Sequence, residues 1–77
     1  MNKTRNIKYI KAFGENLRKI RQKKQLTMLN LAFEADIEYS QIAKIERGLS
    51  NPTISIAYAL ANALNVKVTE LFSFPNP

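Results

Sequence analysis

The sequence predicts a small all-α domain of five helices. Three observations lead to this prediction: apolar residues recur every three or four positions, residue types that begin or end helices separate these stretches, and almost no stretch alternates with the period of a strand. The chain has 77 residues, enough for one domain, and its apolar fraction of 45% is too high for a disordered chain. We therefore expect one compact, helical body.

The first helix is expected to run from about Lys8 to Lys24. Its apolar residues lie three or four positions apart and form one stripe, while basic residues occupy the other faces. This spacing indicates a helix with one side against the core. The stripe consists of Ile10, Phe13, Leu17 and Ile20.

Short second and third helices are expected on either side of a very short turn. Thr27 is a suitable N-cap for a helix over residues 28–35, and Asp36 tolerates the left-handed backbone of a turn. A third helix over residues 39–47 would end before Gly48, because glycine commonly follows the last turn of a helix.

A fourth helix is expected over residues 54–64, after a loop that contains Pro52. Thr53 is its N-cap, and Asn65 can end it in place of glycine. Its buried stripe is expected to comprise Ile54, Ala57, Leu60, Ala61 and Leu64. The remaining segments are a connection over residues 66–68, one last helical turn over 69–72 and a tail over 73–77 that is expected to fray.

The composition excludes most kinds of catalytic and metal site. The chain has no cysteine and no histidine, so it has no disulfide, thiolate zinc site, cysteine nucleophile or imidazole base. Its six acids are scattered, whereas calcium or magnesium requires a cluster. We therefore expect no metal, no cofactor and no enzymatic activity. The basic N-terminal segment lacks the apolar stretch of a signal peptide, and no run approaches the ~18 apolar residues of a membrane span, so we expect a cytoplasmic protein without membrane contact.

Positive charge is concentrated in the N-terminal third of the chain. Twelve basic residues against six acidic ones give a net charge of +6, and residues 1–24 carry nine of the basic side chains against Glu15 alone. A basic surface on so small a body favours a polyanionic partner, nucleic acid before a membrane. The alternative is a first helix whose lysines and arginines form an ordinary solvated face, and charge alone does not decide between the two.

The order of these elements, with a short second helix and a short turn before the third, is typical of a helix-turn-helix domain. An ordered set of residues within 13–72 carries a family pattern: Leu26-Thr27, Leu31-Ala32, Ala35, Ile42, Ile45-Glu46-Arg47-Gly48, Asn51-Pro52-Thr53, Leu60-Ala61, Ala63-Leu64-Asn65-Val66 and Glu70-Leu71-Phe72. With these residues the segment resembles the lambda-repressor-like (Xre-type) helix-turn-helix family, which implies a compact five-helix DNA-binding domain over 13–72. We expect residues 1–12 to be a basic N-terminal extension continuous with the first helix and residues 73–77 to be a short tail.

The third helix is the candidate for reading bases. Its period places two isoleucines on one side and small, polar and basic residues on the other, which alone would also suit an ordinary surface helix. The resemblance implies that the second face enters the major groove of double-stranded DNA, where lysine, serine and tyrosine can contact base edges or a thymine methyl. The implied base-reading residues are Tyr39, Ser40 and Lys44, with Gln41 at the edge of the face.

Phosphate contacts are expected at helix N-termini, where free N–H groups favour anions. Thr27, Asn51 and Thr53 mark two such sites, and both threonines also serve as plain helix caps. The resemblance implies that Arg47 clamps the DNA backbone. It further implies a structural ion pair between Arg21 and Glu46 that fixes the third helix to the first.

The resemblance implies a sequence-specific transcription regulator. We expect it to bind a pseudo-palindromic operator as a homodimer, because one chain of 77 residues reads only a few base pairs. The dimer interface is expected at the C-terminal end, because one helical turn cannot bury all of its large apolar side chains. The residues concerned are Val68, Leu71, Phe72 and Phe74. The alternative is that Leu71 and Phe72 complete the core of the monomer. The alternative function is an antitoxin-like or other protein-interaction module whose DNA binding is secondary.

The chain departs from the family pattern on the second helix. Met28 replaces a common glutamine, and Glu38 replaces a small hydroxyl residue before the third helix. Leu29 and Phe33 are apolar where polar side chains are usual. We expect the N-terminal extension to fold its apolar side over Leu29 and Phe33. The alternative is that the two residues form a second surface for protein contact.

Overall fold

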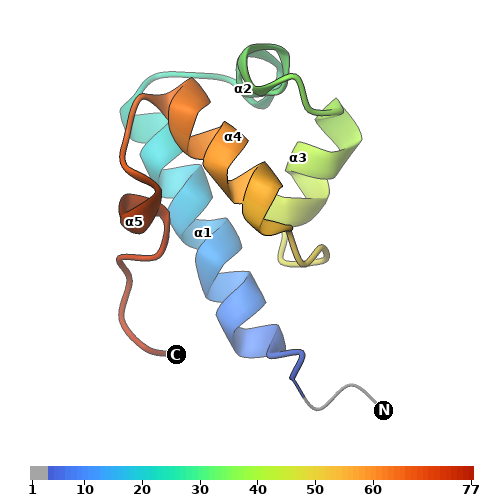
Figure 1. The fold of residues 1–77 in the computed structure, drawn as a ribbon, viewed down its shortest axis with the longest axis vertical. Helices are drawn as coiled ribbons and strands as arrows, with labels where there is room; N and C mark the ends of the chain where they lie inside the picture. Colours follow the sequence, from blue (N-terminus) through green and yellow to red (C-terminus); the bar gives the residue numbers. More distant parts are fainter. Residues whose placement is uncertain (1–3) are drawn as a thin grey trace.

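The structure, a computed structural model, describes residues 4–77 and contains five α-helices joined by short loops (Figure 1). The helices are α1 (Ile7–Lys23), α2 (Met28–Ala35), α3 (Tyr39–Glu46), α4 (Ile54–Leu64) and α5 (Val68–Leu71). No strand occurs between residues 4 and 77, so the predicted all-α class is confirmed. Lys3 and the two residues before it, which belong to the expected basic extension, lie outside the described residues.

The predicted bounds hold for α2 and α4 and differ by one residue elsewhere. α1 begins at Ile7, because the side chain of Asn6 accepts a hydrogen bond from a backbone N–H of the first turn (2.9 Å) and caps the helix there. Residues 7–12 of the expected extension therefore form the first turns of α1. α5 begins at Val68, one residue before the expected start, because Lys67 has the extended backbone of an N-cap.

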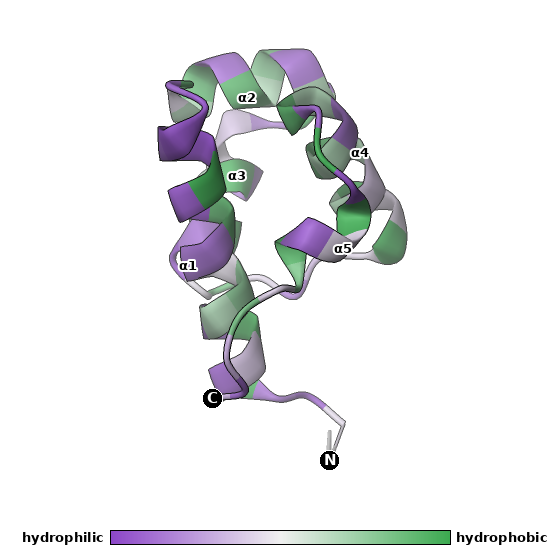
Figure 2. Cartoon of the chain, turned by 90° about the vertical axis from the view of Figure 1, so that its left-hand side faces the viewer, coloured by the Kyte–Doolittle hydropathy of each residue, from purple (hydrophilic) through white to green (hydrophobic). Residues whose placement is uncertain are grey.

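All five helices contribute to one hydrophobic core. α1 contacts α3 and α5, α2 contacts α3 and α4, and α4 also contacts α5. Hydrophobic and hydrophilic residues alternate along α1 and α2 in Figure 2, as they do in helices with one buried side. The largest fully buried side chains are Leu17, Leu31, Ile42, Ile45, Leu60, Leu64 and Leu71. Each stabilises the fold by about 1.5–3 kcal/mol relative to an exposed side chain, and the two isoleucines hold α3 in place.

Left-handed residues end three of the helices or follow them closely. Three of them are residues that the sequence predicts at helix ends: Asp36 (φ 57°), Gly48 (φ 74°) and Asn65 (φ 57°). A fourth left-handed residue, Gln25 (φ 61°), follows α1 and is not predicted, because glutamine rarely adopts this backbone. There the backbone N–H of Leu26 donates to the carbonyl oxygen of Arg21 at 3.1 Å, which turns the chain towards α2.

The C-terminal tail packs along α1, so the expectation that it frays is wrong for its first residues. The ring of Phe74 lies 4.9 Å from that of Tyr9, and the ring of Phe72 lies 4.9 Å from that of Phe13. The side-chain amide of Asn16 donates to the last two carbonyl oxygens of α5, both at 2.9 Å. Both views show the tail running beside α1 (Figures 1 and 2).

These contacts overturn the expected role of the N-terminal extension. Two of its apolar residues face the core and the tail: Ile10 is buried, and Tyr9 contacts Phe74, while Ile7 is 50% exposed. Leu29 and Phe33 are 65% and 82% exposed, so residues 4–12 of the extension do not cover them. The reason is that α1 is one continuous helix, and α2 follows its C-terminal end, at the opposite end of α1 from the extension (Figure 1).

Candidate nucleic-acid interface

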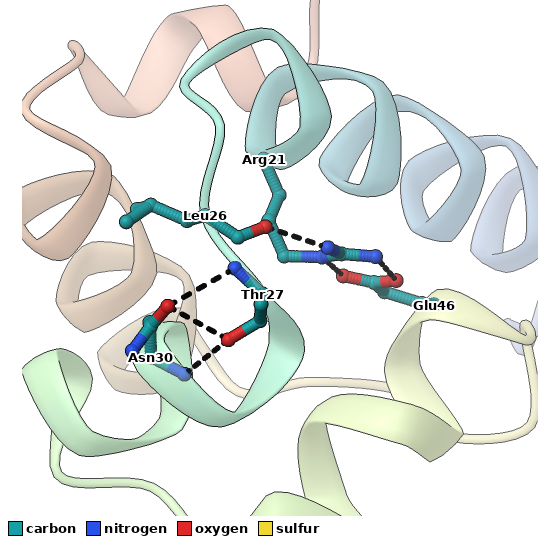
Figure 3. Close-up of polar contacts among 5 residues, drawn as sticks. All are labelled: Arg21, Leu26, Thr27, Asn30 and Glu46. Atoms are coloured by element: carbon teal, nitrogen blue, oxygen red, sulfur yellow. Dashed lines mark hydrogen bonds and ion pairs between the residues drawn. The ribbon is translucent and has the colours of Figure 1, made fainter.

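A buried pair of charges fixes the end of α3 to α1 (Figure 3). Arg21 Nε donates to Glu46 Oε2 at 2.6 Å, and Arg21 Nη2 donates to Glu46 Oε1 at 2.9 Å, so two hydrogen bonds join one guanidinium to one carboxylate. Arg21 Nη1 also donates to the carbonyl oxygen of Leu26 at 2.8 Å, and this third hydrogen bond connects the α1–α2 loop to the ion pair. The hydrogen bonds to Glu46 raise the pKa of Arg21, while burial opposes the rise. The ion pair that the resemblance implies is present.

Gly14 allows α1 and α3 to meet backbone to backbone. A Cβ at this position would overlap the carbonyl oxygen of Ile45 and lie 3.0 Å from that of Glu46. No neighbouring residue in the sequence indicates this contact, because it joins segments some thirty residues apart. The position of α3 is therefore set by direct backbone contact as well as by the ion pair.

The opposite side of α3 presents a polar and basic face to solvent. Its two isoleucines are fully buried on the inner side. Gln41 is half-buried and lies at the edge of the outer face. The exposed residues of this face are Tyr39, Ser40, Lys44 and, directly after the helix, Arg47. The structure thus brings all the expected base-reading residues to one helix, with Gln41 less accessible than the others.

The two predicted threonines cap the N-termini of α2 and α4. Thr53 Oγ1 accepts a hydrogen bond from the N–H of Ile56 at 3.1 Å. The hydroxyl of Thr27 accepts from the N–H of Asn30 at 3.0 Å and donates to Asn30 Oδ1 at 2.8 Å (Figure 3). A hydroxyl has one hydrogen, so the Thr27 side chain is occupied by the cap, and backbone N–H groups of the first turn are the donors left for an anion. Asn51, in the loop before α4, is exposed.

The residues expected at a dimer interface fall into two groups. Val68 and Phe72 are 37% and 43% exposed, and Phe74 is half-buried against Tyr9. Leu71 is fully buried in the core of the domain, so it has no surface to offer a partner. For Leu71, the alternative that it completes the core of the monomer is therefore the one that the structure shows.

Ile54 and Tyr58 on α4 extend this apolar surface, and the sequence does not place them there. Ile54 is 91% exposed and Tyr58 is 61% exposed. The prediction that Ile54 lies in the buried stripe of α4 is wrong: its side chain is exposed at the start of the helix, whereas Ile56 packs against the core and Ala57 is buried. Ile54 and Phe72 line a hollow of about 240 Å³ between α1, α4 and α5. We name the exposed set of Ile54, Tyr58, Val68 and Phe72 the α4–α5 surface.

Two other kinds of site are not found in the part of the chain that the structure describes. Between residues 4 and 77, no three acidic side chains come close enough together to hold a metal ion. None of the helices in this range is both long enough and apolar enough to cross a membrane.

Two proteins with related sequences are regulators. The control protein C.BamHI of Bacillus amyloliquefaciens is 35% identical over 72 residues, which are 92% of this chain and 86% of that protein. The immunity repressor protein of Bacillus phage phi105 is 36% identical over 58 residues, or 75% of this chain. This chain spans only 40% of the length of the phage repressor.

A solved structure shows the same fold. The restriction-modification controller protein C.AhdI from Aeromonas hydrophila has a TM-score of 0.81 and 35% sequence identity, over 82% of this chain and 96% of that one. The helix-turn-helix family matches residues 17–71, which include α2, α3 and the buried ion pair. The chain therefore belongs to the helix-turn-helix family of Xre, lambda-repressor-like type, and it is a DNA-binding transcription regulator and not an enzyme.

Proposed function

We propose that the protein binds a pseudo-palindromic operator as a homodimer, with α3 of each protomer in the major groove. The observation that carries this proposal is the exposed polar and basic face of α3, together with the way the helix is held. Gly14 and the Arg21–Glu46 pair fix α3 against α1. A helix fixed in this way can keep its outer side chains in register with base edges, which specific recognition requires.

Lys44 is the principal base-reading residue in this proposal. It is exposed in the second half of α3, and its ammonium group can donate to O6 and N7 of guanine. The hydroxyl of Ser40 can serve either kind of base, and Tyr39, at 47% exposure, can pack against a thymine methyl or bond a phosphate. Gln41 is half-buried and makes a smaller contribution.

Phosphate contacts would position α3 without reading sequence. Arg47 follows α3 directly and is exposed, so its guanidinium can clamp the backbone beside the groove. Asn51 and Thr53 lie at the N-terminus of α4 and can donate to a second phosphate together with its N–H groups. At the N-terminus of α2, which Thr27 caps, the first-turn N–H groups would serve the same purpose.

The α4–α5 surface is the proposed dimer interface. Its two α4 residues, Ile54 and Tyr58, are exposed and lie one turn apart on the same face of the helix, and Ile54 lines the same hollow as Phe72. Large apolar side chains exposed in this way would be covered by contact with a second protomer. Phe74 would contribute at the edge, and Leu71 only by supporting α5.

The names of the relatives favour control of transcription as the outcome of binding. One relative is an immunity repressor, and another is a control protein. We infer the same kind of role for this chain, in the cytoplasm, where a regulator of this kind meets its DNA.

Selection of bound sites from random DNA duplexes tests the proposal. We expect the enriched sequences to contain two inverted half-sites whose centres lie about 34–36 Å apart, one turn of the double helix. Enrichment of a single half-site without its inverted copy would contradict the homodimer. No enrichment over the starting pool would contradict sequence-specific binding.

Contact with another protein is a second candidate function, and the exposure of Leu29 and Phe33 favours it. Both line a hollow of about 500 Å³ beside α2. Glu34, Asp36 and Glu38 lie close by in the sequence and are exposed, so a basic partner would suit this surface. We expect Phe33→Ser to retain operator affinity while it changes the regulation of a reporter gene. An unchanged reporter would remove this candidate.

A further inference from the structure

A hollow of about 230 Å³ opens between α1, α2 and α3. Of the residues that line it, only Arg47 has been assigned a DNA contact above. Its lining residues are Arg18, Arg21, Met28, Ala43, Glu46 and Arg47. Arg18 lies one turn before Arg21 on the same face of α1, and Ala43 lies one turn before Arg47. The hollow therefore reaches from α1 to the end of the helix that carries Lys44.

The charges of this hollow are not balanced. Arg21 and Glu46 neutralise each other through their two hydrogen bonds. Arg18 and Arg47 are exposed, and within residues 4–77 neither forms an ion pair. The hollow thus keeps two positive charges, and its single carboxylate is already bonded.

The other side chains that line the hollow would neither repel an anion nor accept hydrogen bonds from the two arginines in its place. Met28 contributes a thioether chain and Ala43 a methyl group, and neither side chain is a strong hydrogen-bond acceptor. Met28 is also the first residue of α2, an eight-residue helix whose N-terminus carries a partial positive charge. Ala43 keeps the hollow open, because a longer side chain at that position would enter it.

We propose that this hollow binds one phosphate of the DNA backbone between the guanidinium groups of Arg18 and Arg47. The proposal rests on the proposed DNA binding of α3 and adds Arg18 to the residues that carry it. Arginine suits this role because its planar fork can donate two hydrogen bonds to one phosphate. Because α1 and α3 already meet at Gly14, one phosphate held from both sides fixes the depth at which α3 enters the groove.

Titrations of an operator duplex with the full chain test the role of Arg18. We expect Arg18→Ala to weaken binding to specific and random duplexes alike by about tenfold, the loss of one charge-assisted contact. The slope of log affinity against log salt, which is negative, should become less steep by about 0.9. Lys23→Ala is the matched control, because Lys23 is an exposed basic residue on the same helix that does not line the hollow. Equal effects of the two variants on affinity and slope would show that Arg18 contributes only net charge, and would overturn the proposal.

A scan with methylphosphonates, which replace one charged phosphate at a time by a neutral group, tests whether both arginines hold the same phosphate. We expect one position at which the wild-type protein loses affinity while Arg18→Ala and Arg47→Ala lose almost nothing more. Insensitivity of the two variants at different positions would overturn the shared site. Wild-type binding without any Arg18 effect would overturn this inference and leave the proposed function standing, whereas absence of wild-type binding would overturn both. Because Arg18 is exposed, thermal unfolding should be unchanged, and Arg18→Gln, which keeps the stem of the side chain, provides a second variant if Arg18→Ala is unstable.

Discussion

Gly14 on α1 and Ile45 on α3 are in backbone contact: the carbonyl oxygen of Ile45 occupies the place of a Cβ on Gly14. The two residues lie 31 positions apart in the sequence. Ile45 is fully buried, so the contact lies in the interior of the protein, directly beside Glu46. The same small area therefore positions the recognition helix and the ion pair that holds it.

Gly14→Ala should destabilise the protein, because the new methyl group can be accommodated only if α1 and α3 move apart. We expect the free energy of unfolding in urea to fall by about 3 kcal/mol, at the upper end of the range for overpacked cores. The control is Asn62→Ala on the exposed side of α4, which should change it by less than about 0.5 kcal/mol. A Gly14→Ala protein as stable as the wild type would mean that the helices adjust freely at this contact.

Glu46→Gln should cost more than the ion pair contributes. The substitution leaves the buried Arg21 without a charged partner, so we expect the free energy of unfolding to fall by about 3–5 kcal/mol. The double variant Arg21→Met with Glu46→Leu should recover much of this loss, because it removes both charges and keeps apolar volume. Equal stability of the single and double variants would contradict the account of a stranded charge.

Alkaline pH provides a control for this prediction. The hydrogen bonds to Glu46 raise the pKa of Arg21, so the folded protein holds that proton more tightly than the unfolded chain does. The resulting stability is fully present below the ordinary pKa of arginine and is lost only as the pH rises through the raised value. The stability difference between wild type and Glu46→Gln should therefore stay constant from neutral to mildly alkaline pH. A difference that shrinks in this range would argue against the pair as its source.

Lys44→Ala and Arg47→Ala should separate base reading from phosphate binding. We expect Lys44→Ala to weaken binding to the best site by about 1–3 kcal/mol and to relax the preference at one base pair. Arg47→Ala should weaken binding to all sequences to a similar degree and reduce the salt slope. Titrations on the selected site and on a random duplex measure both effects. If the variants behave alike on both duplexes, the division of roles between the two residues is wrong.

Local signals in the sequence were sufficient to predict most helix ends. Thr27 and Thr53 cap their helices through N–H groups three residues away, and Asp36 and Asn65 adopt a backbone that their own side chains favour. Such interactions act within one turn, so they can be inferred from neighbouring residues. The outer face of α3 was predictable in the same way, from helical period alone.

Features that depend on distant residues were not predictable. Asn16 donates to carbonyl groups 54 and 55 residues away. Glycine is required at position 14 because the backbone of α3, much later in the chain, leaves no room for a Cβ there. The period of α4 placed Ile54 in its apolar stripe, but only the structure shows where the core ends. The Arg21–Glu46 pair was accessible through family resemblance, whereas the position of Arg18 at a hollow was not.

The α4–α5 surface should govern dimer formation. Changing both Ile54 and Phe72 to serine should raise the dimer dissociation constant in sedimentation equilibrium by at least about a hundredfold, since two large apolar contacts are lost. Ile54 is 91% exposed, whereas Phe72 also contacts the ring of the buried Phe13, so the variant should lose some stability and circular dichroism must show that it is folded before the constants are compared. Leu29→Ser is the control, because it also replaces a large, exposed apolar side chain but lies on α2, and it should leave the dimer dissociation constant unaltered. An unchanged constant in the double variant would place the interface elsewhere.

Tyr9 and Phe74 should stabilise each other and thereby hold the C-terminal tail on α1. Their ring centroids lie 4.9 Å apart with an interplanar angle of 53°, a tilted arrangement that favours aromatic attraction. We expect a double-mutant cycle of Tyr9→Ala and Phe74→Ala to give a coupling of about 0.5–1.5 kcal/mol in the free energy of unfolding. Pairing Tyr9→Ala with Asn76→Ala is the control, because Asn76 is an exposed residue of the same tail, and this pair should be additive. Hydrogen exchange in α5 should quicken in Phe74→Ala, since the tail and Asn16 hold the end of this short helix together. A coupling near zero would show that the tail lies beside α1 without stabilising it.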